Sequence, residues 1–344
     1  AGRAPGAFDA VRTWAPTPWG SQQSFAPNNL GNPALGPERT AEWEVGFESS
    51  TIDDRLTLDF TYYNQITTDA LVSVGSPPSM GDWTNQLENI GKLKNTGLEL
   101  GVTMNAVRGR VWNVDVGGDI STNNSEILSL GRGTNSSSIR VGEPFPVVRG
   151  KHIMNPYDIA DPIYANDGDW FWFGPMTPTL MLTPRTTISM PKGIVLSVRG
   201  EYAGGHWGRD GASEWAMIEG NAEYPACWDA YPLIASGQTD QLNAIERAWC
   251  TRTDFNRRTF QYPRDFFKLR EVSVVLPLGG FVFERAERAT LTLSGRNLYR
   301  WVRPEHRAYD PEAGGWRPGH STNNTNWQRP SPPKAFTMQL RVTF

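Results

Sequence analysis

The sequence lacks long apolar runs, has only two cysteines and carries almost balanced charge, and each shortage excludes a class of protein. A membrane-spanning helix needs about 20 apolar residues in a row, and no run in this chain approaches that length. Two cysteines without flanking histidine pairs cannot fill a tetrahedral zinc site. A net charge of -3, from 33 basic and 36 acidic residues, gives no electrostatic reason to expect a nucleic-acid partner.

Aromatic residues, glycine and proline are abundant instead. The chain has 14 Trp, 15 Phe and 10 Tyr beside 34 Gly and 26 Pro, which suits many strands joined by elaborate loops better than a helical domain. The hydrophobic share of 38% resembles that of a soluble protein. A barrel whose strands alternate lipid-facing and lumen-facing residues has the same average, so the composition remains compatible with a membrane barrel.

The last nine residues alternate without a break between apolar and polar side chains. The apolar face carries Phe336, Met338, Leu340, Val342 and Phe344. Successive side chains of a strand point to opposite faces, and a transmembrane strand needs only about 9 to 11 such residues. Closing a barrel would also remove the edge that an apolar-faced terminal strand otherwise exposes. The pattern therefore predicts a barrel strand.

Eight earlier segments alternate in a similar way. The nine predicted strands are 39–50, 56–63, 98–105, 112–121, 179–190, 194–203, 266–276, 289–297 and 336–344. Asp59, Glu99, Asp115 and Asp119 fall on the polar faces, which is costly in a dry core but not in a wet lumen. We expect an all-β fold, an antiparallel transmembrane β-barrel of which these are nine strands.

The predicted connections alternate in length. Short ones cover 51–54, 108–110, 191–193 and 277–288, and long loops cover about 67–95, 123–178, 204–264 and 299–334. Outer-membrane barrels have short periplasmic turns and long extracellular loops, so we expect residues 1–38 to be an extracellular loop segment, 39–344 to be barrel, and the C-terminus to be periplasmic. Because nine strands ill suit a complete bacterial barrel and no signal peptide is visible, we expect part of a longer protein or a processed chain.

Cys227 and Cys250 lie 23 positions apart in a polar, aromatic-rich stretch. This spacing favours a disulfide that closes a loop in an oxidising compartment. Two free buried thiols are the alternative.

Several short motifs resemble TonB-dependent outer-membrane receptors of the SusC/RagA-like branch, and they occur in the family's order. They are GNPALGPERT at 31–40, EVGF at 44–47, DFTYYN at 59–64, TDAL at 68–71, NIGKLKNTGLEL at 89–100, FKLREVSV at 267–274, SGRNLY at 294–299 and YDPE at 309–312. The terminal Phe344 is similar to the end signal that such barrels offer to their assembly machinery.

The resemblance implies a 22-stranded barrel around a plug, which imports nutrients across the outer membrane with energy from the inner membrane. Outer-membrane lipid and the TonB complex are the implied partners, the latter through an N-terminal part that is missing here. In the branch with a SusD-type lipoprotein lid, extracellular loops also bind that lid. No energy-coupling residue can be transferred to this chain, because none lies within it.

One loop combines carboxylates with aromatic rings. Its candidate ligand-binding residues are Asp158, Asp161, Asp167, Asp169, Trp170 and Trp172, since aromatic faces stack on sugar rings or apolar groups while carboxylates accept hydrogen bonds or hold a cation. The alternative is that the rings fold the loop onto itself or lie at the membrane interface. Asp167 and Asp169 could donate oxygens to calcium, but the EF-hand pattern is absent, and we assign no metal.

A second set of aromatic and histidine residues occupies the later loops. It comprises His206, Trp207, Trp215 and Trp316 as candidate contributors to an external binding basin. Self-packing of loops that lack a core is the equal alternative.

The sequence shows no catalytic signature: Gly-x-Ser-x-Gly, His-Glu-x-x-His and the phosphate loop are all missing. We expect no enzyme and no cofactor. The predicted function is nutrient import by a TonB-dependent transporter, the nutrient being an oligosaccharide, a peptide or a chelate. The first alternative is a structural or adhesive surface barrel that binds a neighbouring protein, and the second is a soluble all-β binding module.

Overall fold

The computed structural model describes residues 4–75, 85–131, 139–211, 213–214, 227–251, 259–278, 288–306, 310–312, 325–326 and 330–344. The chain divides into two units, of which the first comprises residues 1–45, 62–97 and 123–145 and the second 46–61, 98–122 and 146–344. Strands dominate both.

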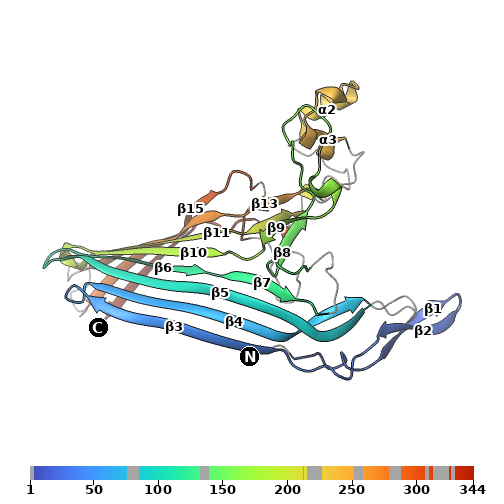
Figure 1. The fold of residues 1–344 in the computed structure, drawn as a ribbon. Helices are drawn as coiled ribbons and strands as arrows, with labels where there is room; N and C mark the ends of the chain where they lie inside the picture. Colours follow the sequence, from blue (N-terminus) through green and yellow to red (C-terminus); the bar gives the residue numbers. More distant parts are fainter. Residues whose placement is uncertain are drawn as a thin grey trace. The chain divides into compact units, whose positions relative to one another are not determined.

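Most strands belong to one antiparallel sheet (Figure 1). It is built from β3 (Arg39–Thr51), β4 (Leu56–Gly75), β5 (Asn85–Arg108), β6 (Asn113–Thr122), β10 (Leu180–Ser189), β11 (Val195–Gly204), β14 (Phe266–Leu278), β15 (Arg288–Val302) and β17 (Ala335–Thr343). Hydrogen-bonded neighbours follow the order β17-β15-β14-β11-β10-β6-β5-β4-β3, and β7 (Asn124–Ser129) also pairs with β5. The nine predicted strands are confirmed, and each pairs with its neighbours along the chain. Among the described residues the sheet is open, with β3 and β17 at its ends.

The predicted loop at 67–95 is wrong in its extent. β4 continues to Gly75 and β5 already begins at Asn85. The first part of β5 pairs with β7, for example Asn95 with Ser125, and the Asn89 amide donates to the carbonyl oxygens of Gly36 and Asp69. Backbone and amide hydrogen bonds hold this stretch, so apolar alternation alone could not find it.

The two faces of the sheet differ as the alternation predicts. Large apolar side chains that are exposed on one face include Trp43, Val45, Phe47, Met104, Val116, Leu293, Phe336 and Met338. The other face carries hydrogen-bonded polar groups: the Asn105 amide donates to Asp115 at 2.7 Å, and Arg185 donates to Asp119 at 2.7 Å and to Thr103 at 3.0 Å. Asp115 and Asp119 are therefore paired members of a polar face.

The short turns of the second unit lie where the sequence predicts them, and they contain residues with left-handed backbone conformations. Ile52, Asp53 and Asp54 all have positive φ between β3 and β4, and Lys192 and Gly193 do so between β10 and β11. These turns lie at the same end of the strands as the C-terminus (Figure 1). The connection at 277–288 lies mostly outside the described residues.

The long loops contain structure that the alternation did not reveal. Residues 1–38 hold a hairpin of β1 (Thr13–Trp19) and β2 (Gln22–Asn29). The later loops contain β8 (Val147–Gly150), η2 (Ala165–Gly168), β9 (Phe171–Pro175), β12 (Trp207–Asp210), α2 (Ala230–Ala235), η5 (Thr239–Gln241), α3 (Ala244–Cys250), β13 (Gln261–Pro263) and β16 (Thr325–Asn326), while η3 (Pro191–Gly193) is the short turn between β10 and β11. None of the described helices is long and apolar enough to cross a membrane.

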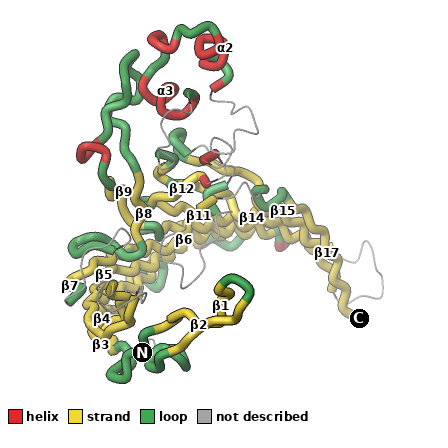
Figure 2. The backbone as a smooth tube through the Cα atoms, turned by 90° about the vertical axis from the view of Figure 1, so that its right-hand side faces the viewer, coloured by secondary structure: helices red, strands yellow, loops and turns green. Residues whose placement is uncertain are grey.

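Parts of two loops build a small lobe around a disulfide, which we call the disulfide lobe: residues 153–164, 227–251 and 260–262. Its core includes Leu242, fully buried, and Phe260, whose ring stacks on Trp249 at 4.7 Å. Figure 2 shows β8 and β9 leading from the strands toward α2 and α3. The lobe thus has a hydrophobic core separate from the sheet.

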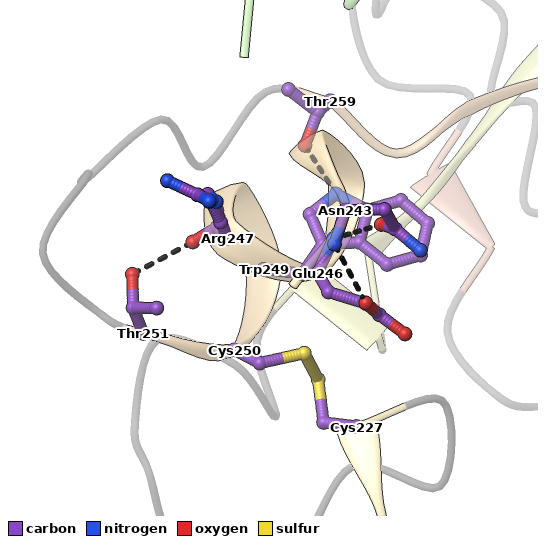
Figure 3. The surroundings of a disulfide bond; sticks show 8 residues. All are labelled: Cys227, Asn243, Glu246, Arg247, Trp249, Cys250, Thr251 and Thr259. Atoms are coloured by element: carbon purple, nitrogen blue, oxygen red, sulfur yellow. Dashed lines mark hydrogen bonds between the residues drawn. A yellow bond between two sulfur atoms is a disulfide. The ribbon is translucent and has the colours of Figure 1, made fainter. Parts of the chain in front are cut away.

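The predicted disulfide between Cys227 and Cys250 is confirmed, with Cα atoms 5.7 Å apart (Figure 3). It ties α3 to the segment before α2. Asn243 begins α3 with a capping box, in which its side chain accepts from the Glu246 backbone N–H and the Glu246 carboxylate accepts from that of Asn243. The Trp249 indole donates to Thr259 at 2.8 Å. Each end of this short helix is therefore fixed by side chains.

Candidate functional site

A row of partly exposed aromatic rings runs along the β8–β9 hairpin. The Phe171 ring lies 4.8 Å from His152 and 4.9 Å from Phe173, and Phe173 lies 5.0 Å from Trp207 on β12. The alternation of Phe171 and Phe173 along β9 puts both rings on one face. Of the predicted aromatic residues, Trp207 is thus brought into a ring cluster, but Trp172 belongs to the opposite face of β9.

A cation lies over the ring at the start of this hairpin. The Arg149 guanidinium carbon is 3.9 Å from the centroid of Trp170, and the Lys151 ammonium is 5.8 Å from the same ring. Such stacking fixes the orientation of a guanidinium. Arg149 is opposite Trp172 in the β8–β9 ladder, so the Arg149–Trp170 pair and the ring row lie on opposite faces of the hairpin. We call the hairpin with these two groups the cation–aromatic platform.

The four predicted carboxylates do not act as one group. Asp161 accepts from Arg247 of α3 at 2.7 Å, and the backbone carbonyl of Asp158 accepts from Ala244 at the start of the same helix. Asp167 has a left-handed backbone within η2, and the Asp169 side chain accepts from its neighbour Trp170 at 2.7 Å. Asp158 and Asp161 therefore help to attach the loop to α3, while Asp167 and Asp169 shape a turn. Among the described residues, no three potential ligands are grouped as for a metal ion.

His206 is buried, with only 5% of its surface exposed. Burial, together with the nearby Arg264 guanidinium, lowers the pKa of His206 to about 4, and the same two causes lower the pKa of His306 to about 4. Both imidazoles are thus neutral near pH 7. His206 lies beneath the loop surface and is not positioned to touch a ligand in this conformation.

Glycine is required where the chain leaves β11 for this region. Gly205 has a φ of +73°, and a Cβ there would lie 2.0 Å from the Thr179 hydroxyl. Its N–H donates to the Asp265 carboxylate at 2.9 Å. The position demands both a left-handed backbone and the absence of a side chain.

The sequence did not predict a buried charge cluster at the base of the last loop, which we call the loop latch. The Lys268 ammonium of β14 donates to Asp310 at 2.8 and 3.0 Å, and both groups are at least 95% buried. Lys268 and Arg270 also pair with Glu312, Arg270 with Glu201 at 2.8 Å, and Arg300 with Asp310 at 3.2 Å. The pairing lowers the pKa of Asp310 and of Glu312.

The loop latch also borders a hollow of about 360 Å³, which is lined by Lys268, Asn297, Tyr299, Arg300, Asp310 and Lys334, among others. The sequence placed Lys268 only within a predicted strand and a family-like motif. Its partner lies 42 positions later in a loop, and no period in the sequence joins the two.

Two predicted site residues, Trp215 and Trp316, lie outside the described residues. Phe344 follows directly after β17 and is 79% exposed. Its role in barrel assembly stays a prediction.

Comparisons with known proteins agree with the fold. Residues 1–298 match the family model "TonB dependent receptor-like, beta-barrel". Two relatives from Formosa agariphila are TonB-dependent receptor P26, 29% identical over 147 residues, and TonB-dependent receptor P39, 31% identical over 126 residues. These alignments cover 39% and 36% of this chain, and only 15% and 12% of the two receptors.

The fold is similar to that of solved RagAB chains. A structure of the RagAB peptide transporter gives a TM-score of 0.70 at 17% identity, and the RagAB peptide importer in the "open-open" state gives 0.69 at 18%. The matches cover 98% and 100% of this chain but 39% of each RagAB chain, so this chain spans well under half of their length. The strands, their alternation and the family match agree: the chain belongs to the TonB-dependent receptor family, and its sheet is part of that family's outer-membrane β-barrel.

Proposed function

We propose that the chain is part of a TonB-dependent active importer of the outer membrane, and that its long loops help to capture the nutrient. The observation that carries this proposal is the cation–aromatic platform, built on a loop hairpin of a barrel whose apolar face suits lipid. Membership of the family gives the general part of the proposal, an outer-membrane receptor. The specific part, import of a solute by this protein, is what the experiment has to test.

Peptides are the substrate class that we propose to examine first. One face of the platform carries the Arg149–Trp170 pair, whose positive charge attracts a carboxylate, and the other carries the rings of Phe171 and Phe173, which suit apolar side chains. The solved chains of similar fold are named as parts of a peptide transporter, which supports the same class. Oligosaccharides and chelates are the competing classes, since aromatic faces also stack on sugar rings.

Partners and orientation belong to the proposal as well. We propose that the long loops are extracellular and the short turns and C-terminus periplasmic, as the loop lengths favour. Coupling to the TonB complex would use parts of the protein outside this chain. A SusD-type lipoprotein is the proposed lid.

The test is uptake by cells that produce the full-length protein. We expect labelled peptides to accumulate, accumulation to stop when the proton gradient is dissipated, and Trp170→Ala to lower uptake at limiting substrate about tenfold, because the stacked ring no longer orients Arg149. Trp19→Ala is the matched control, since Trp19 is 78% exposed in the β1–β2 hairpin and lies outside the platform. Energy-independent binding without accumulation would contradict import.

A structural or adhesive barrel is the alternative. It is favoured by the large exposed apolar side chains of the disulfide lobe, such as Tyr157 and Ile159. In that case deletion of the gene would impair attachment to a neighbouring protein or cell and would leave the uptake of all three nutrient classes unchanged.

A further inference from the structure

The hollow beside the loop latch lies on the polar face of the sheet, within the second unit. Lys268 and Arg300 are opposite each other in the β14–β15 ladder, and both donate to Asp310. The next pair of the ladder, Phe267 and Trp301, carries rings and points to the opposite, apolar face. A molecule in the hollow is therefore a solute of the wet side and not the acyl chain of a lipid.

The hollow lies between two segments that separate beyond the last pair of the β15–β17 ladder. Arg296 and Ala335 form that pair, and the next residue of β15, Asn297, has a left-handed backbone with a φ of +54°. The Asn297 amide donates to the Pro333 carbonyl at 3.1 Å, which fixes the segment that leads into β17. The two segments supply most of the lining, and the volume of about 360 Å³ lies within the range of small-molecule sites.

The groups around the hollow carry an excess of positive charge. The latch itself is balanced, with the cations Lys268, Arg270 and Arg300 against the carboxylates Asp310, Glu312 and Glu201. Lys334, which is exposed, adds a cation to the lining and has no ion-pair partner among the described residues. Arg264, only 3% exposed, adds another and donates to the Pro311 carbonyl of the latched loop. These two cations bring the sum to +2.

The sum stays positive when the count is widened. Arg303 pairs with both Asp265 and Glu305, one cation against two carboxylates, which lowers the sum to +1. Residues 303–334, the whole of the last loop, contain five basic and three acidic residues. All three acidic residues are already in the count, so the remaining charged residues of the loop are arginines. The rest of the loop therefore adds positive charge and cannot neutralise the hollow.

The one carboxylate among the described lining residues is already compensated. Asp310 is 1% exposed and accepts from Lys268, from Arg300 and from the backbone N–H of Glu312. Its charge is thus spent within the latch. Lysine and arginine are the side chains that bind carboxylate and phosphate groups, so the lining suits a molecule with an anionic end.

We propose that this hollow binds the oxyanion group, carboxylate or phosphate, of a small organic solute. Lys334 and Arg300 supply the positive charge, and Leu298 and Pro332 supply apolar lining for the rest of the solute. The proposal does not rest on import, because equilibrium binding in the hollow needs no energy coupling and is measured without it.

The first part of the test is isothermal titration of the purified full-length protein in detergent at low salt. Inorganic phosphate and succinate are the probes, and succinamide, which has the shape of succinate without its charge, is the control. We expect one-to-one binding of at least one anion with a dissociation constant of about 1 mM or below, an affinity that falls as salt rises, and no binding of succinamide. Binding of neither anion at about 10 mM, or equal binding of succinamide, would overturn the proposal.

Charge variants of one exposed residue locate the site. Lys334→Gln should weaken binding about fivefold and Lys334→Glu at least about tenfold, whereas Lys334→Arg should stay within about twofold. Lys192→Gln is the matched control, because Lys192 is exposed in the turn between β10 and β11 and lies outside the hollow. An unchanged affinity in Lys334→Glu, or an equal loss in Lys192→Gln, would place the bound anion elsewhere and overturn the proposal.

A steric variant separates the hollow from general attraction of anions. Ser331→Phe keeps every charge but fills part of the space with a ring, so we expect it to abolish binding of the larger probe, succinate. Succinate binding that persists unchanged in Ser331→Phe would show that the anion lies outside the hollow.

Native mass spectrometry of the receptor purified from outer membranes tests a lipid headgroup as the source of the oxyanion. We expect no lipid adduct that depends on Lys334. A phospholipid or lipopolysaccharide adduct that disappears in Lys334→Glu would assign these cations to a headgroup and overturn the solute site.

Discussion

The sheet and the disulfide lobe are built for opposite surroundings. In the sheet the large apolar side chains point outward, as with Met338 at 75% exposure, and the polar groups bond one another on the other face. In the lobe Leu242 and Phe260 are buried and the charges are outside. Apolar atoms can be exposed to lipid without a free-energy cost, whereas an unpaired polar group there is costly; in water the costs are reversed. One chain therefore contains two kinds of folded region, and they differ in whether the large apolar side chains face outward or form a buried core.

The loop latch fixes the last loop to strand β14 of the sheet through buried charge. Asp310→Asn should have the largest effect on stability, up to about 3 to 5 kcal/mol against release of that loop, since the buried Lys268 ammonium would lose its more buried carboxylate and keep only that of Glu312. The measurement is denaturant-dependent proteolysis of the full-length protein in detergent. Asp119→Asn is the control: its pair with Arg185 is about half exposed, so the expected loss is about 0 to 1 kcal/mol. Equal losses would mean that the latch is no more than a surface pair.

The apolar face of β17 gives the sharpest test of the lipid side. Met338→Arg should destabilise the full-length barrel in bilayers by up to about 2 to 4 kcal/mol, because the cation enters the hydrocarbon layer. Gln339→Arg places the same cation on the neighbouring residue of the other face and should cost much less. Urea titration in lipid vesicles measures both. A larger loss from Gln339→Arg would reverse the assignment of the two faces.

The disulfide should matter to the lobe alone. Replacing Cys227 and Cys250 together by serine should cost the lobe about 2 to 4 kcal/mol, since the cross-link restricts the unfolded loop. Hydrogen exchange should rise in residues 227–251 and stay unchanged in β10 and β11. Faster exchange in those strands would show that the stability of the sheet depends on the lobe, and would contradict the expectation that the disulfide matters to the lobe alone.

The same difference explains what the sequence could predict. In Phe336 to Phe344 and in the other barrel strands, apolar and polar side chains alternate with a period of two residues, because one face contacts lipid. This period can be recognised within each segment by itself. The lobe core joins Ile153, Leu242 and Phe260, which are far apart in sequence and share no period. Lys268 and Asp310 were likewise visible only as members of two separate family-like motifs, at 267–274 and 309–312. The disulfide was the exception, because two cysteines allow one intramolecular pairing.

Acid provides the finest distinction between the loops and the sheet. His206 and His306 both face Arg264; Asp265 also acts on His206, and Arg300 and Asp310 act on His306. With folded pKa values of about 4 against 6.5 in the unfolded chain, both histidines bind protons more readily once released. Stability of the loops therefore falls as the pH drops from about 6.5 toward 4, by roughly 1 to 2 kcal/mol per histidine at about pH 5, and is unaffected by these groups above about pH 7.

Hydrogen exchange at about pH 7 and pH 5, corrected for the intrinsic rates, measures this loss. We expect residues 206–210 and 259–265 to open more readily at the lower pH, while β10 and the first half of β11 stay protected, because neither histidine lies in those strands. The pH difference should disappear in the double variant His206→Gln, His306→Gln, whose side chains do not titrate. The carboxylates of the latch cannot mimic the effect, since the pKa values of Asp310 and Glu312 are lowered and both stay ionised at pH 5. An unchanged pH response in the double variant would assign the acid sensitivity to other groups.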